Sequence, residues 1–176
     1  MIRVGQNPWR IYMNHDGRYA ITPNNGDETI SIIDLQTDKV AATLEAGPDM
    51  TGVNFAAGKA FVISSTSGFV YVYNMSSLRP AGRLKIGANI QLETATTDTA
   101  EEKLYLADST ENAVVIIDAK SQTFEKVFNV GLFPWGTTSW TARTTTVIET
   151  TAAVRRRRRD DRRQRGRAGK ARSPEV

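Results

Sequence analysis

Side chains that could carry out chemistry are few and widely spaced in this sequence. It holds one histidine, His15, and no cysteine, which excludes disulfides, Cys-ligated zinc and thiol catalysis. His15 lies in the run Asn14–Gly17, which is typical of a tight turn, and we interpret it as a turn residue. Asp16, Asp49 and Asp98 lack the spacing of a calcium loop, so we assign no metal site. The motifs of phosphate-binding loops, nucleophile elbows, zinc proteases and dinucleotide-binding folds are absent, and we name no catalytic residue.

A polar residue recurs after short apolar runs. Asp34, Asn74 and Asp118 each follow a run of Val, Ile or Tyr and stand 40 and 44 residues apart. A catalytic carboxylate rarely occurs in every repeat, whereas a side chain that caps a turn does. We therefore interpret these three residues as structural.

A second landmark keeps the same period. Gly5, Gly47, Gly87 and Gly131 each follow an apolar residue and are spaced 42, 40 and 44 residues apart. Each interval contains four short runs rich in Val, Ile, Tyr and Thr, with Gly, Asn, Asp and Pro between them. Four strands in about 40 residues is the pattern of a propeller blade. The sequence predicts an all-β fold, a partial β-propeller over 4–140, with three four-stranded antiparallel blades at about 4–46, 47–86 and 87–130 and the start of a fourth at 131–140.

The first unit resembles the YVTN-type repeat family of β-propellers. The resemblance rests on Gly5, Pro8, the Asp16–Gly17 turn, Ser31–Asp34 and Thr37–Val40. The later units keep only part of this pattern, since the second lacks the early proline and the aspartate of its turn. The family is related to propellers that bind haem d1 and to bacterial periplasmic propellers. The resemblance thus implies a parent protein that works in the periplasm or outside the cell, although the chain shows no signal peptide.

The resemblance also suggests where a ligand would bind. In such propellers the loop leading into the innermost strand of each blade lies at the mouth of the central channel, where ligands usually bind. The residues of these loops are therefore our candidates for ligand binding: Trp9, Arg10, Asp49, Asn89 and Trp135. The alternative for Trp9 and Trp135 is that both pack between adjacent blades as core residues.

The leading hypothesis is a non-catalytic propeller fragment that acts as a scaffold for a protein or a small ligand. The alternative is a fragment of a propeller enzyme: an oxidoreductase, a haem-d1-binding protein similar to nitrite reductase, or a lactonase-type propeller. No cofactor is evident in the chain, and haem d1 is expected only in the parent protein. Three blades leave open inter-blade faces, so we expect the isolated chain to be marginally stable and prone to aggregate.

Charge separates the chain into two parts. Residues 141–176 hold 12 of the 23 Lys and Arg and only 4 of the 19 Asp and Glu, leaving 11 basic and 15 acidic residues in 1–140. The segment 141–176 is expected to be a disordered Arg-rich tail. Three interpretations stay open: the tail binds nucleic acid or an acidic surface through Arg155–Arg172, it is solvated and has no partner, or residues 137–176 are the non-native product of a frameshift. No stretch of the sequence reaches the length of about 18 apolar residues that a membrane-spanning helix needs.

Overall fold

The computed structural model describes residues 1–87, 91–135, 137–142 and 145–150. This part consists of antiparallel sheets in which each strand pairs with its neighbour along the chain. Blade 1 contains β1 (Tyr12–Met13), β2 (Tyr19–Asn24), β3 (Thr29–Asp34) and β4 (Lys39–Glu45). Blade 2 contains β5 (Met50–Ala56), β6 (Lys59–Ser64), β7 (Phe69–Asn74) and β8 (Arg79–Lys85). Blade 3 contains β9 (Leu92–Thr97), β10 (Lys103–Asp108), β11 (Ala113–Asp118) and β12 (Thr123–Asn129).

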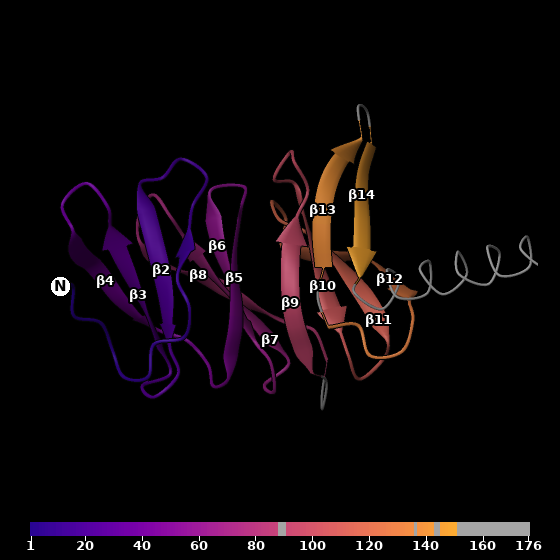
Figure 1. The fold of residues 1–176 in the computed structure, drawn as a ribbon, viewed down its shortest axis with the longest axis horizontal. Coiled ribbons are helices and arrows are strands. Elements are labelled where there is room, and N and C mark those ends of the chain that lie inside the picture. The colour runs from indigo at the N-terminus through magenta and orange to yellow at the C-terminus, as the bar shows by residue number, and fades with distance from the viewer. Residues whose placement is uncertain (88–90, 136, 143–144, 151–176) are drawn as a thin grey trace, which may run out of the picture.

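The predicted all-β fold with three four-stranded antiparallel sheets is confirmed. The sheets stand face to face in chain order, and a hairpin of β13 (Thr137–Ala142) and β14 (Thr145–Thr150) follows blade 3 (Figure 1). The register also repeats, because each blade has an irregularity at the same place between its third and fourth strands. The capping role expected of the recurring polar residues is confirmed as well. Asp34, Asn74 and Asp118 each accept hydrogen bonds from backbone N–H groups two or three residues further on.

The hydrophobic core lies between the blades. Every strand presents alternate residues to opposite faces, and both faces of blade 2 are covered. One cluster joins blades 1 and 2 through side chains such as Ile21, Ile32 and Val62. The other joins blades 2 and 3 through Phe61, Leu104 and their neighbours. Each sheet therefore depends on the next one for burial of its apolar side chains, as in repeat proteins generally.

Two tyrosines that alternate with apolar residues in the strands connect blade 1 to blade 2. The hydroxyl of Tyr73 donates a hydrogen bond to the carbonyl oxygen of Glu45 at 2.5 Å, and that of Tyr12 donates one to Thr51 at 3.0 Å. Burial raises the pKa of both phenols, more strongly for Tyr73, while Arg10 partly opposes the shift at Tyr12. These side chains stay neutral donors at ordinary pH and hold the two sheets in register.

The landmark glycine of the second unit, Gly47, is required for a steric reason. A Cβ atom on Gly47 would lie 2.6 Å from the ring and the hydroxyl oxygen of Tyr71, which real Cβ atoms do not approach. Glycine at this point lets the chain that leaves blade 1 pass close to a tyrosine of blade 2. Gly5 shows the same kind of contact, since a Cβ atom there would overlap the carboxylate of Asp27, so in both units the landmark glycine marks a close approach of the connector to the blade that follows it.

The carboxyl-terminal part differs from the sequence-based expectation. The fourth unit was predicted to stop at residue 140 and a disordered tail to begin at 141, but β14 extends to Thr150. Thr, Val and Ile favour strands, and the hydroxyl of Thr137 fixes β13 to blade 3 by donating to the Tyr105 carbonyl at 3.1 Å. The remaining predicted tail, 151–176, lies outside the described residues. In the part that is described, no helix is long and apolar enough to cross a membrane.

Candidate functional site

The ligand-binding residues predicted from the sequence lie on the connectors, the segments that lead into the first strand of each sheet. Trp9 and Arg10 precede β1, Asp49 precedes β5 and Trp135 precedes β13, while Asn89 lies outside the described residues. Arg10 stacks on the Trp9 ring, with its guanidinium carbon 5.7 Å from the ring centroid. Asp49 instead accepts a hydrogen bond from Thr66 within its own blade. Each of these two contacts stays within one blade and its connector. Whether the connector residues bind a ligand stays a prediction.

The two connector tryptophans are exposed. Trp9 keeps 48% and Trp135 keeps 62% of its surface accessible. Whether they pack between adjacent blades, the alternative considered for them, stays a prediction. Exposed aromatic rings remain available for contact with a ligand or with another protein surface.

A different set of residues meets at the opposite ends of the first strands. The turns that join the first and second strands of blades 1, 2 and 3 gather there. The first is closed by hydrogen bonds from Gly17 N to Asn14 O and from Arg18 N to Asp16 Oδ1, at 3.0 and 2.8 Å. The second is the two-residue turn Ala57–Gly58, in which both φ angles are positive, as a tight hairpin between twisted strands requires.

The third turn, 98–102, is held by a carboxylate. Asp98 Oδ1 accepts hydrogen bonds from the backbone N–H groups of Glu102 and Lys103, at 2.8 and 3.2 Å. Glu101 has a positive φ of 55°, and its carbonyl oxygen accepts a hydrogen bond from Ala57 N at 3.1 Å. Because this bond joins the turns of blades 2 and 3, the position of the Glu101 side chain is set by both.

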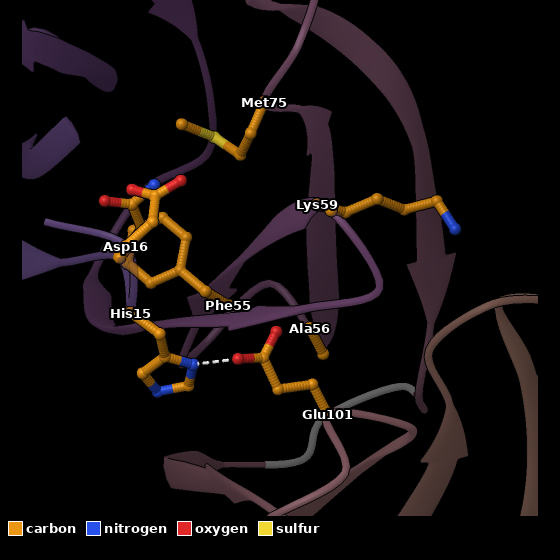
Figure 2. A pocket seen from close by; sticks show the side chains of 9 residues that line it. His15, Asp16, Phe55, Ala56, Lys59, Met75 and Glu101 are labelled. Carbon is orange, nitrogen blue, oxygen red and sulfur yellow. Dashed lines mark hydrogen bonds and ion pairs between the residues drawn. The ribbon is translucent and has the colours of Figure 1, made fainter. Parts of the chain in front are cut away.

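The turns of blades 1 and 3 are joined by a contact between His15 and Glu101. Nδ1 of the imidazole contacts Oε1 of the carboxylate across 86 positions of sequence. Blade 1 is thereby linked to blade 3, and the dashed line in Figure 2 marks this contact. Both side chains remain partly exposed to solvent. We call this contact the His15–Glu101 clasp.

A hollow of about 400 Å³, the first hollow, lies on one side of the clasp. Its floor is apolar, because it is formed by the buried side chains of Phe55, Ala56 and Met75. Its polar rim comes from blades 1 and 3 and includes Asp16 and Glu101. Lys59 also borders the hollow, but Figure 2 shows its side chain directed away from the clasp.

The ammonium group of Lys59 is engaged elsewhere. Nζ donates hydrogen bonds to the carbonyl oxygens of Ala119 and Lys120 in blade 3, both at 2.9 Å. This lysine therefore supports the contact between blades 2 and 3. Among the described residues that line the first hollow, the charges left beside the apolar floor are the carboxylates of Asp16 and Glu101, with the imidazole of His15 between blades.

The second hollow, of about 440 Å³, lies on the other side of the clasp between blades 2 and 3. It shares His15 and Glu101 with the first hollow and is otherwise lined by amide, hydroxyl and carboxylate side chains: Asn54, Thr96, Thr97, Asp98 and Thr99. The paired hollows can accept hydrogen-bond donors and positive charge on carboxylates, and they offer an apolar surface on one side.

Sequence reasoning placed His15 on a turn, where it lies, but missed its contact with Glu101. The contact joins residues from two different blades, and no local sequence motif predicts such a pair. The usable signal was positional, because 14–17 and 98–101 are the corresponding turns of two repeats. Corresponding turns of neighbouring blades converge at one end of the central strands.

The comparisons with known proteins support the fold. No family model and no curated protein matches the sequence. Among solved structures, the chain is similar to hydrazine synthase of Kuenenia stuttgartiensis, with 18% identity and a TM-score of 0.66, over 74% of this chain and 39% of that one. It is similar to the periplasmic gluconolactonase of Pseudomonas aeruginosa, with 17% identity and a TM-score of 0.59, over 73% of this chain and 42% of that one. It is also similar to dihydro-haem d1 dehydrogenase NirN, with 14% identity and a TM-score of 0.61, over 84% of this chain and 32% of that one.

These similarities establish the propeller-like arrangement of the blades and nothing finer. At identities of this order, shared architecture does not carry over a substrate or a cofactor. The chain spans about a third to two fifths of the length of the three structures. The fold is shared with enzymes and with a haem-d1 protein, and the narrower YVTN-type assignment remains a proposal.

Proposed function

We propose that the chain is a non-catalytic binding scaffold whose ligand sits in the hollows beside the His15–Glu101 clasp. The observation that carries this proposal is the convergence of turns from all three blades on two adjoining hollows. Binding sites commonly combine an apolar surface with a few fixed polar groups, and they often form where several structural units meet. The YVTN-type repeat and a location outside the cytoplasm belong to the same proposal and rest on the sequence resemblance.

The chemistry of the first hollow favours a ligand with a short apolar body and a positively charged group. The apolar body would cover the floor at Phe55 and Met75, and the charge would approach the carboxylates of Asp16 and Glu101. A small amine, a guanidine or a basic side chain of a protein fits this description. An anion would be repelled by the same carboxylates.

Calorimetric titration with small probes tests this proposal. Agmatine and butylamine are expected to bind with a Kd of about 0.1–10 mM, and butyrate more weakly. Glu101→Gln keeps the shape of the side chain but removes its charge, so agmatine should bind about twofold to fivefold more weakly. Asp49→Asn is the matched control on a connector and should leave agmatine binding unchanged. Equal binding of butyrate, or a loss caused by Asp49→Asn alone, would contradict the proposal.

A fragment of a propeller enzyme is the second candidate. It is supported by the names of the three similar structures, a synthase, a lactonase and a dehydrogenase. In this candidate the reacting groups belong to other blades of the parent protein, including any site for haem d1. The only histidine of the chain, His15, lies on a turn with its Nδ1 in contact with Glu101. A change in the Soret absorbance of added haem d1 that the parent protein produces and this chain alone does not would favour this candidate.

A further inference from the structure

His15 and Glu101 lie between the two hollows. Among the described residues, these two line both hollows, and Nδ1 of the ring contacts Oε1 of the carboxylate. Their side chains are 60% and 38% exposed, so a ligand in either hollow can approach them. His15 is also the only histidine of the chain. The charge at the boundary of the hollows therefore depends on the protonation of a single ring.

Charged residues from all three blades line the hollows around this ring. Asp16 lies next to it in the turn of blade 1 and lines the first hollow. Blade 3 contributes Glu101 and, in the second hollow, Asp98. Lys59 of blade 2 also lines the first hollow, but its ammonium group donates to two carbonyl oxygens of blade 3 and is directed away from the clasp (Figure 2). Among the described residues that line the hollows, the charged groups left around His15 are thus three carboxylates.

A proton on the imidazole changes this balance of charge. Histidine side chains gain a positive charge between about pH 8 and pH 5, whereas carboxylates take up protons near about pH 4 and lysine stays charged up to about pH 10. While the ring of His15 is neutral, the negative charge of Glu101 is available to a ligand. The imidazolium form places a positive charge against that carboxylate. A cationic ligand then competes with the ring for Glu101.

We propose that protonation of His15 controls cation binding in the hollows, so that the affinity for a cation is high above about pH 7 and falls below about pH 6. This inference rests on the proposed function, because it concerns the same ligand and the same hollows. Binding of the cation and binding of the proton oppose each other, so each weakens the other to the same extent. Solvent around the exposed side chains limits the effect. We expect the Kd of agmatine to rise about threefold to tenfold between about pH 7.5 and pH 5.5.

Calorimetric titration of the full chain with agmatine, at about pH 7.5, 6.5 and 5.5 and constant ionic strength, tests the inference. Agmatine keeps both of its positive charges over this range, so only the protein changes its charge. His15→Gln retains a polar side chain but has no group that is protonated in this range, so its Kd should change by less than about 1.5-fold. Asp49→Asn, on a connector, is the matched control and should keep the pH dependence of the wild type.

The protons exchanged on binding give a second readout. Titration in two buffers that differ in ionisation enthalpy, at about pH 6, should show the wild type releasing a fraction of one proton per agmatine bound and His15→Gln releasing none. Circular dichroism at each pH shows that the sheets are retained. A wild-type Kd that stays constant, or a pH dependence that persists in His15→Gln, would overturn the inference and leave the proposed function intact. Absence of agmatine binding at every pH would overturn both.

Discussion

Tyr73→Phe perturbs the link between blades 1 and 2 with the least change in shape. The ring of Tyr73 is 1% exposed and belongs to the cluster between the two sheets, so phenylalanine retains the packing. What is lost is the hydrogen bond from the hydroxyl to the Glu45 carbonyl. Loss of one buried hydrogen bond costs about 1–2 kcal/mol of the free energy of unfolding. For a folded part of this size, that corresponds to a fall in Tm of about 3–8 °C.

The matched control is Tyr71→Phe. Tyr71 lies two residues earlier on the same face of β7, and its hydroxyl has no hydrogen bond to any described residue. Its loss should therefore change the free energy of unfolding by less than about 0.5 kcal/mol. Urea unfolding followed by circular dichroism, at one low protein concentration, measures both variants. Equal effects of the two substitutions, or no effect of Tyr73→Phe, would refute the assignment of this bond as a link between blades.

The pH dependence adds a second readout for the same residue. Burial raises the pKa of Tyr73 in the folded chain above its value in the unfolded chain. The stability that depends on the neutral phenol is therefore complete below about pH 10 and declines as the pH rises beyond it. The difference in stability between the wild type and Tyr73→Phe should shrink above about pH 10. A difference that stays constant up to about pH 11 would contradict this.

Three further substitutions test other parts of the structure by urea unfolding. Gly47→Ala would place a Cβ atom 2.6 Å from Tyr71 and should destabilise the chain by about 1–3 kcal/mol, and an unchanged midpoint would remove the steric reason for this glycine. Lys59→Met loses two hydrogen bonds to blade 3 and should cost about 1 kcal/mol, whereas no cost would mean that the bonds are not formed in solution. Hydrogen bonds from Ser121 hold the pKa of Asp118 below its usual range, so its stabilising effect is lost as the pH falls through about 4 and below. Asp118→Asn should thus lose less stability than the wild type between about pH 5 and pH 2.5, and equal losses would contradict the role of this carboxylate.

The sequence was informative where the structure repeats. The spacing of Gly5 and Gly47 and the recurring Asp34, Asn74 and Asp118 predicted the blades and their turns, because both signals depend on contacts within one repeat or between adjacent ones. Strand boundaries followed from runs of β-branched and aromatic residues. The hairpin of β13 and β14 was missed because its residues, rich in Thr, follow the strand propensities of the earlier blades but not their landmark pattern.

The candidate site was much less predictable. His15 and Glu101 lie 86 residues apart and meet only because the turns of different blades converge. In the sequence, Phe55 and Met75 of the apolar floor cannot be distinguished from ordinary core residues. By contrast, Trp9 and Trp135 stand out in the sequence through their positions after proline. The family resemblance favoured the connector end of the blades for that reason, and the hollows lie at the other end.

Mapping of backbone amide chemical shifts during titration with agmatine tests the central functional claim most directly, because it reports which end of the blades binds the probe. The account predicts saturable shifts at the three turns, 14–17, 57–58 and 98–101. These shifts should be absent when Glu101→Gln is combined with Asp16→Asn. Shifts confined to the connectors at 6–10, 47–49 and 131–135 would contradict the account and would favour the site predicted from the sequence. No saturable shift at either end would contradict both.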